Sequence, residues 1–275
     1  MNHIYGKNVF ITGGSSGIGL STAELFAANG YTVYSGSRAP STEIRGFPGG
    51  GEIRPIVIDV CCPQSTEAAA KYVLDNADIG IIIHCAGIGI ACPGEDFPQD
   101  TVSELFETNL YGVLRVNSLF LPALRKRGGG LCVIIGSVAA VYSIPFQAHY
   151  CASKAAVYSY AKALRMEMRD FGVRVSLVSP GDTSTGFTNS RKYELLPDSP
   201  YYKACLASVK KMEKDEQSGR APSSVARVIL KLCSNKNPPG HKIVGGDYKL
   251  LVFLRRLLPE RIIELILRSI YLKQT

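Results

Sequence analysis

The residues best suited to catalyse a reaction are a tyrosine and a lysine four positions apart, Tyr150 and Lys154. Residues 149–171 have helical spacing, which would place both side chains on one face. A phenol with its ordinary pKa of about 10 is a poor acid or base near neutrality, but a lysine ammonium one turn away favours the phenolate. Ser137 ends a predicted strand and could donate a hydrogen bond to a substrate oxygen. Together these residues predict proton exchange with an alcohol or ketone oxygen, although the tyrosine–lysine spacing alone also suits an ordinary exposed helical pair.

A glycine-rich loop, TGGSSGIG at residues 12–19, joins the first predicted strand to the first predicted helix. Glycine permits positive φ and close approach of a ligand to the backbone, and a helix N-terminus attracts a pyrophosphate. A turn that merely changes the chain direction is the alternative, but the position at the start of a sheet favours a dinucleotide. The expected contacts in this loop are Gly13, Ser15, Ser16, Gly17, Ile18 and Gly19.

The end of the second predicted strand bears on the choice between NAD and NADP. No aspartate or glutamate occurs between Glu24 and Glu43, where an acidic residue would hold the ribose hydroxyl of NAD. The strand ends instead in Ser37 and Arg38, and a guanidinium can fork onto a 2′-phosphate. A solvated loop arginine stacked on the adenine is the alternative. The pattern favours NADP over NAD as the cofactor.

Strand-like and helix-like stretches alternate along the chain, which predicts an α/β fold with helices on both faces of a doubly wound parallel sheet. The expected strands are 7–12, 31–35, 55–60, 78–84, 130–137 and 173–178, and the expected helices are 17–29, 63–76, 100–126 and 149–171. We expect one dinucleotide-binding and catalytic domain over 1–247, with an ordered lid at about 182–222, and an apolar, basic extension over 248–275.

With these motifs in order, the first 190 residues resemble the short-chain dehydrogenase/reductase family. The matching pieces are TGGSSGIG at 12–19, Asp59-Val60, Ala86-Gly87, Asn109 to Gly112, Ser137, YCASK at 150–154, and Pro180-Gly181. The chain departs from the family at His84-Cys85, where the family usually has two asparagines, and this puts one structural hydrogen bond in doubt. We interpret His84 as a core histidine, His149 as a packing residue and Cys151 as a small helix residue.

The resemblance implies a role for each matching residue. Tyr150 would be the acid/base, with Lys154 tuning it and holding the nicotinamide ribose. Ser137 would position the substrate oxygen, and Asn109 would anchor a water in a proton relay. The implied cofactor contacts are Asp59 and Val60 at the adenine, Ala86 and Gly87 after the fourth strand, and Pro180, Gly181, Thr183 and Thr185 near the carboxamide. The family also implies a homodimer or homotetramer.

The net charge of +8 is unevenly distributed. From Lys249 onward the chain has six basic and two acidic residues, a net charge of +4 in an apolar tail. Because the excess lies in this tail, the charge does not favour nucleic acid as a partner. The eight cysteines show no CxxC pair and no metal-like spacing with histidine, which indicates thiols in a reducing, cytoplasmic compartment and no metal site.

The lid and the tail carry the remaining hypotheses. Aromatic and aliphatic residues in 182–222 suit a bulky, uncharged steroid- or lipid-like alcohol or ketone, or they pack on the protein itself. Pro259 divides the tail into two segments, neither long enough to span a membrane. The tail could cover the lid, form a subunit contact, or lie on a membrane surface. A catalytically silent dinucleotide-binding scaffold is the alternative to an enzyme.

Overall fold

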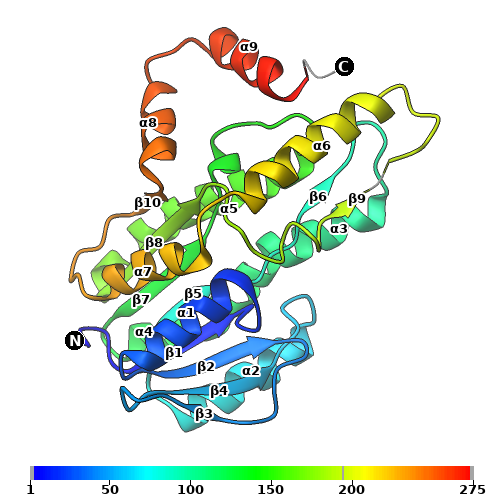
Figure 1. The fold of residues 1–275 in the computed structure, drawn as a ribbon. Coiled ribbons are helices and arrows are strands. Elements are labelled where there is room, and N and C mark those ends of the chain that lie inside the picture. Colours follow the sequence, from blue (N-terminus) through cyan, green and yellow to red (C-terminus); the bar gives the residue numbers. More distant parts are fainter. Residues whose placement is uncertain (1–2, 194, 273–275) are drawn as a thin grey trace.

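The protein is built on one central sheet with helices on both faces, as the computed structural model of residues 3–193 and 195–272 shows (Figure 1). The strand order is β10-β8-β7-β5-β1-β2-β4-β3, and all neighbours are parallel except β3, which runs antiparallel to β4. This confirms the predicted doubly wound fold. The strand order reverses beside β1, because the chain continues on one side of β1 to β2 and on the other side to β5.

The strands of the main sheet are β1 Asn8–Thr12, β2 Thr32–Ser37, β3 Arg45–Gly46, β4 Glu52–Val57, β5 Ile79–His84, β7 Gly130–Ile135, β8 Val173–Pro180 and β10 His241–Val244. The helices around it are α1 Gly17–Ala28, α2 Pro63–Asn76, α3 Gln99–Phe106, α4 Gly112–Lys126, α5 Ala148–Glu167 and α7 Pro222–Cys233. A separate two-stranded sheet pairs β6 (Ile90–Ala91) with β9 (Lys192–Tyr193). The outer helices are α6 Tyr202–Gln217, α8 Gly246–Leu254 and α9 Glu260–Tyr271.

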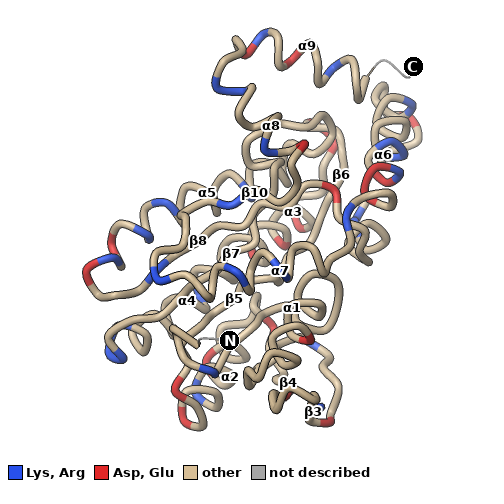
Figure 2. Tube along the Cα trace, turned by 60° about the vertical axis from the view of Figure 1, so that its left-hand side comes forward, with Lys and Arg blue, Asp and Glu red and all other residues tan. Residues whose placement is uncertain are grey.

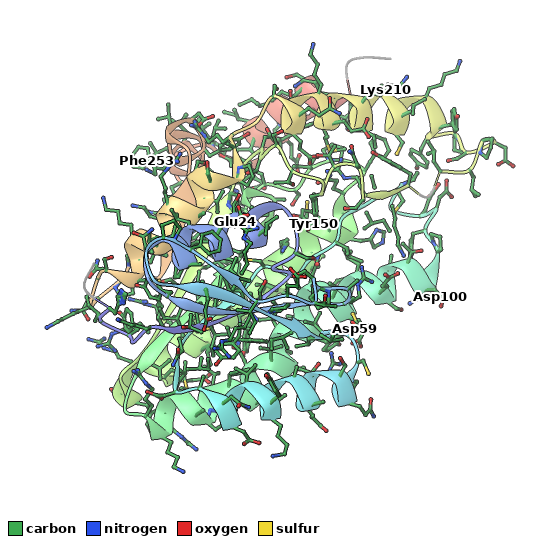
Figure 3. All side chains as sticks on the ribbon, turned by 60° about the horizontal axis from the view of Figure 1, so that its bottom comes forward. Glu24, Asp59, Asp100, Tyr150, Lys210 and Phe253 are labelled. Atoms are coloured by element: carbon green, nitrogen blue, oxygen red, sulfur yellow. The ribbon has the colours of Figure 1, made fainter. Side chains whose placement is uncertain are left out.

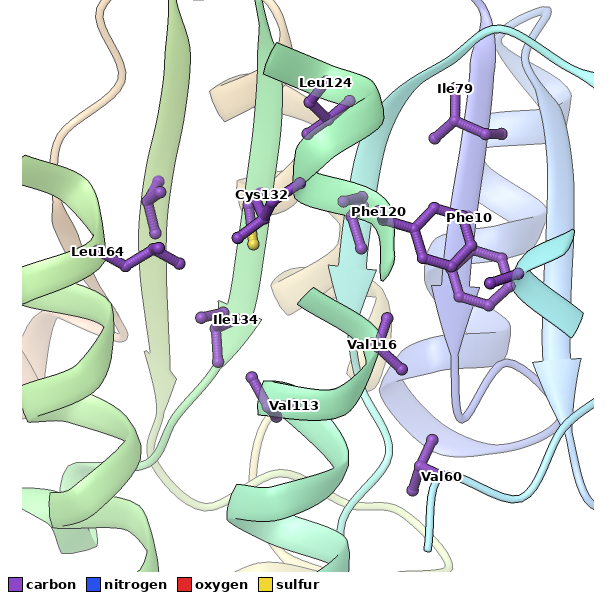
Figure 4. Close-up of a cluster of buried hydrophobic side chains, with 14 of the residues drawn as sticks. Phe10, Val60, Ile79, Val113, Val116, Phe120, Leu124, Cys132, Ile134 and Leu164 are labelled. Atoms are coloured by element: carbon purple, nitrogen blue, oxygen red, sulfur yellow. The ribbon is translucent and has the colours of Figure 1, made fainter. Parts of the chain in front are cut away.

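Two apolar layers hold the sheet between its helices. One face packs on α2, α4 and α5, and its fully buried Phe10 and Phe120 rings stack with their centroids 4.4 Å apart (Figure 4). The other face packs on α1 and α7 around Phe26 and Ile229. β5 is buried along its whole length, which explains why its sequence is continuously apolar. These layers fix the carboxyl ends of the strands relative to one another.

Three local features differ from the sequence expectations. The predicted helix over 100–126 contains a π-helical turn at Glu107–Tyr111, and this turn carries Asn109. The third strand lies at Glu52–Val57, earlier than the predicted 55–60, because it pairs with β2 over that register. The last parallel strand, β10, was not among the predicted strands, since His241–Val244 is too short and polar to stand out.

The region after β8 and the tail form an outer layer. Residues 182–222 contain β9 and α6, and their function as a lid stays a prediction. Beyond β10, α8 and α9 lie on the same side of the sheet as α6 (Figure 1), with the break at Pro259 as expected. Charged side chains are frequent on α6 and recur on α9 (Figure 2). Lys273, one of the predicted basic residues of the tail, lies outside the described residues.

Candidate active site

The predicted site residues gather at the carboxyl ends of the parallel strands. The glycine loop follows β1, Ala86-Gly87 follows β5, Ser137 follows β7 and Gly181 follows β8. In doubly wound sheets, ligands bind at this edge where the strand order reverses, here between β1 and β5. Figure 3 labels two residues of this region, Asp59 and Tyr150.

The glycine loop packs so closely on neighbouring backbone that two of its positions have no room for a side chain. Gly13 has φ of 69°, and a Cβ there would lie 2.6 Å from the backbone nitrogen of Ala86. A Cβ on Gly19 would lie 2.0 Å from the carbonyl oxygen of Gly13. Ser15 and Ser16 are exposed just ahead of α1, and the Ser16 side chain makes no capping hydrogen bond. The loop therefore fits the pyrophosphate of a dinucleotide, with backbone N–H groups available at the start of α1.

The residues expected at the adenine end lie beside this loop. Ser37 ends β2, and Arg38 follows it on the surface. Within the described residues, Arg38 has no hydrogen-bond or ion-pair partner, so its guanidinium is free to meet a phosphate. Asp59 follows β4, and its carboxylate accepts a hydrogen bond from the Cys61 amide at 2.9 Å. Val60 is buried behind it.

Tyr150, Ser137 and Lys154 come together as the motif spacing predicts. Ser137 lies close enough to Tyr150 to lower the pKa of its phenol. The ammonium of Lys154, one turn along α5, lies 5.9 Å from the centre of the Tyr150 ring. It donates a hydrogen bond to the Ile135 carbonyl at 3.2 Å. A Cβ on Gly87 would lie 3.6 Å from the same nitrogen, so β5, β7 and α5 all contribute to this cluster.

The electrostatics of this cluster differ from the sequence expectation. Burial raises the pKa of Tyr150 to about 12, while Ser137 lowers it by a smaller amount. Burial also lowers the pKa of Lys154, to about 8, and the lowering of the Tyr150 pKa by Lys154 stays a prediction. Desolvation therefore outweighs the attraction between the phenolate and the ammonium. At neutral pH Tyr150 holds its proton firmly.

Asn109 supports the site from the π-helical turn. Its side chain is buried, with 1% exposed, and its amide oxygen accepts from the Ile88 amide at 2.9 Å. Its amide nitrogen donates to the Ile88 carbonyl at 3.0 Å and to the Ser153 hydroxyl at 3.1 Å. Ser153 in turn donates to the Tyr150 carbonyl at 2.8 Å. Asn109 thus joins the loop after β5 to the start of α5, and its role in a water relay stays a prediction.

The residues after β8 meet the glycine loop from the opposite side. A Cβ on Gly17 would lie 3.4 Å from Cβ of Thr185, so this threonine faces the start of α1. Thr183 donates to the Gly181 carbonyl at 2.9 Å. The Tyr248 ring of α8 packs over Gly181, where a Cβ would lie 2.1 Å from it. Pro180 is buried at the end of β8.

An apolar cluster borders the site beneath the outer helices. Its buried members are Ala91, Cys205, Val209 and Met212, and its partly buried members are Ile144, Phe146, Leu195 and Tyr271. These residues come from β6, the segment after Ser137, α6 and α9. The Phe187 ring also lies 5.9 Å from the Tyr150 ring, centre to centre. Packing over the lid was one of the three possibilities for the tail, and Tyr271 of α9 does join this cluster with residues of α6.

The remaining histidine and cysteine interpretations agree with the geometry. His84 is buried and hydrogen bonds through Nε2 to the Asn117 side chain at 2.9 Å, and burial lowers its pKa to about 4. His149 packs on Phe97, and Cys151 is buried in α5. Over residues 3–193 and 195–272, no group of histidine, cysteine or carboxylate side chains is arranged to hold a metal ion. In the same residues, no helix has the length and apolar composition to cross a membrane.

Comparison with known proteins agrees with the geometry. The family model for short chain dehydrogenases matches residues 7–195. The chain is 35% identical to the 3-ketodihydrosphingosine reductase of Bacteroides thetaiotaomicron over 96% of its own length and 97% of the relative. It is 28% identical to the NADPH-dependent 1-acyldihydroxyacetone phosphate reductase of Saccharomyces cerevisiae, covering 84% and 80% of the two chains.

Among solved structures, a short-chain dehydrogenase from Streptomyces avermitilis superposes with a TM-score of 0.79 at 26% identity, covering 96% of each chain. The chain therefore belongs to the short-chain dehydrogenase/reductase family and is an oxidoreductase by that membership.

Proposed function

We propose that the protein is an NADP(H)-dependent reductase that converts the ketone of a bulky, apolar, lipid-like substrate to a secondary alcohol. The observation that carries this proposal is the cluster of Ser137, Tyr150 and Lys154 beside the glycine loop. A scaffold that only bound a dinucleotide would have no physical need for a buried tyrosine–lysine pair at this edge.

In this mechanism each residue has a separate task. A nicotinamide cofactor held by the glycine loop would supply the hydride to the carbonyl carbon. Ser137 donates a hydrogen bond to the substrate oxygen, and Tyr150 transfers its hydroxyl proton to that oxygen as negative charge develops. Lys154 stabilises the resulting phenolate, which regains its proton from solvent. Burial raises the pKa of Tyr150, so at neutral pH this residue carries the proton that ketone reduction requires.

The composition of the apolar cluster supports this substrate class. Its buried side chains, among them Ala91, Val209 and Met212, are uncharged, as contacts to an alkyl or ring system require. Relatives that align with most of the chain include a 3-ketodihydrosphingosine reductase and an NADPH-dependent 1-acyldihydroxyacetone phosphate reductase. For the cofactor, the support is the unpartnered Arg38 at the end of β2 and the NADPH-dependent relative.

The same proposal places α8 and α9 on an anionic membrane surface, with the enzyme otherwise in the cytoplasm. Many large apolar side chains of these helices and of the turn between them are exposed to solvent. They are Leu250, Leu251, Phe253, Leu257, Ile262, Leu265, Ile266 and Ile270. Arg256, Arg261 and Arg268 lie among them. An exposed apolar face interspersed with arginines is typical of helices that lie in the headgroup region. A homodimer or homotetramer stays a prediction from the family.

The surface proposal is tested by vesicle pelleting. We expect the full chain to sediment with phosphatidylglycerol-containing vesicles, and the double variant Phe253→Ser, Leu265→Ser to remain in the supernatant. The matched control, Ile44→Ser with Met166→Ser, removes equally exposed apolar groups from elsewhere and should still sediment. Equal binding by both variants would refute the tail as the contact.

The enzyme proposal is tested by following NADPH oxidation with long-chain ketones, long-chain keto bases and keto steroids. Turnover is expected with at least one of these ketones, and Tyr150→Phe should reduce kcat by about 100-fold or more. NADPH binding by the wild type without turnover on any ketone would favour the dinucleotide-binding scaffold. Unchanged turnover in Tyr150→Phe would refute the role of Tyr150.

A further inference from the structure

A buried arginine lies beside the proposed site with part of its hydrogen-bonding capacity unused. The Arg191 side chain is 1% exposed and pairs through Nη2 with Glu216 of α6. The Thr188 hydroxyl donates to the second oxygen of Glu216 at 2.6 Å. The Nε and Nη1 atoms of Arg191 are buried and, among the described residues, have no partner. Buried charged donors are normally satisfied, so these two atoms require an explanation.

Arg191 is held close to the proposed acid. It immediately precedes β9, and the amide of the next residue, Lys192, donates to the Gly89 carbonyl at 3.1 Å. The Arg191 guanidinium carbon lies 5.9 Å from the centre of the Phe187 ring, which in turn lies 5.9 Å from the Tyr150 ring. The charges of Arg191 and Glu216 both reach the Tyr150 hydroxyl, lowering and raising its pKa respectively.

The ion pair also lies at one end of the apolar cluster. Cys205, Val209 and Met212 of the cluster and Glu216 recur along α6 at intervals of four, three and four residues, which places them on one face. Along this face of α6, a run of buried apolar side chains thus ends at the ion pair near Tyr150. This order matches a substrate whose alkyl part is followed by a polar group close to the reacting carbon.

The charge of the pair indicates which polar group fits. Glu216 already neutralises Arg191, so an anion would add uncompensated negative charge to a buried place, whereas an uncharged oxygen would accept from the free N–H groups at no such cost. We propose that Arg191 is a specificity residue that donates a hydrogen bond to an uncharged hydroxyl or carbonyl oxygen of the substrate, near the ketone that is reduced. This inference rests on the proposed ketone reduction.

The test compares two substrates in several variants. The probes are a long-chain ketone with a hydroxyl group two carbons from the carbonyl, and the same ketone without that hydroxyl. The measured quantity is the ratio of their kcat/KM values with NADPH. Wild type should prefer the hydroxyl-bearing ketone by about 10- to 100-fold, the range for a hydrogen bond from a charged donor. Arg191→Met should bring the ratio close to one.

Two further variants separate recognition from stability. Arg191→Lys retains a positive charge for Glu216 but lacks the second and third nitrogens, so it should fold normally and still lose most of the preference. Lys211→Met, which removes the ion pair to Asp215 on the same helix, should keep the wild-type ratio. A merely structural Arg191 would lower both kcat/KM values together and leave the ratio unchanged.

Three outcomes overturn the inference: no preference in the wild type, an unchanged ratio in Arg191→Lys, or a stronger preference for the phosphate ester of the same hydroxyl. These results differ from failure of the proposed function, in which the wild type would reduce neither ketone.

Discussion

Substitution of Arg38 tests the cofactor preference, which the fold leaves open. Arg38 is exposed at the end of β2, and no described residue pairs with its guanidinium. Replacing it by alanine therefore breaks no internal contact and should leave the thermal stability unchanged. The effect should appear in cofactor affinity alone.

The magnitude follows from the exposure of the side chain. A hydrogen bond to a charged group contributes about 1.5–3 kcal/mol, and solvent around Arg38 places this contact at the lower end. A loss of about 1.4 kcal/mol corresponds to a tenfold change in a dissociation constant. Arg38→Ala should thus weaken NADPH binding about tenfold, and Arg38→Asp should weaken it further because a carboxylate repels the 2′-phosphate.

The assay is titration of both cofactors, by fluorescence and by steady-state KM, for the wild type and each variant. NADH binding should be almost unchanged in Arg38→Ala and should improve in Arg38→Asp, since a carboxylate can accept from the ribose hydroxyl. Arg45→Ala is the matched control, because Arg45 is an exposed arginine nearby that pairs with Glu24. Equal loss of NADPH and NADH affinity in Arg38→Ala, or no loss of either, would refute the role assigned to this residue.

Three other perturbations test the site and its support. The rate of ketone reduction should be constant through neutral pH and fall above about pH 8, because Lys154, whose pKa is about 8, loses its positive charge there. A rate that stays constant up to about pH 10, roughly 2 units above that pKa, would contradict this role. In the reverse direction, alcohol oxidation should rise with pH, because burial holds the pKa of Tyr150 at about 12 and the phenolate fraction grows throughout the accessible range. Asn109→Ala should lower the free energy of unfolding by about 2–3 kcal/mol, because it removes hydrogen-bond partners from Ile88 and Ser153. The measurement is urea denaturation, and an unchanged free energy of unfolding would show that water replaces the amide. Phe120→Ala should cost about 3–5 kcal/mol in the same measurement, because Phe120 is fully buried and stacks on Phe10; a loss below about 1 kcal/mol would mean that the cavity collapses.

The local features of the site could be predicted because each depends on residues close together in the chain. These features are the glycine loop, the Tyr150–Lys154 spacing on α5 and the alternation of strands and helices. Each depends on the periodicity of neighbouring residues, which can be read from the sequence. The order of the motifs then placed them at one edge of a parallel sheet, since the carboxyl ends of such strands share that edge.

Other features depend on balances that no local pattern contains. The sequence predicts a lysine that lowers the tyrosine pKa, whereas burial, which depends on the whole packing around α5, raises it. The sequence also gave no indication that a π-helical turn would direct the Asn109 amide to Ile88 and Ser153. Both differences arise because desolvation and hydrogen-bond partners are set by elements distant in sequence.

The sequence by itself thus determined the fold class, the family, the position of the glycine loop and the identity of the proposed acid. Only the tertiary structure decided which side chains lie around the proposed site. It brought Tyr271 of α9 into an apolar cluster with Ala91 of β6, and it placed Arg191, paired with Glu216, next to Phe187 and Tyr150. Pairings of this kind depend on how α6, α8 and α9 pack over the sheet edge, and a chain can satisfy the same local patterns with many different arrangements of its outer helices.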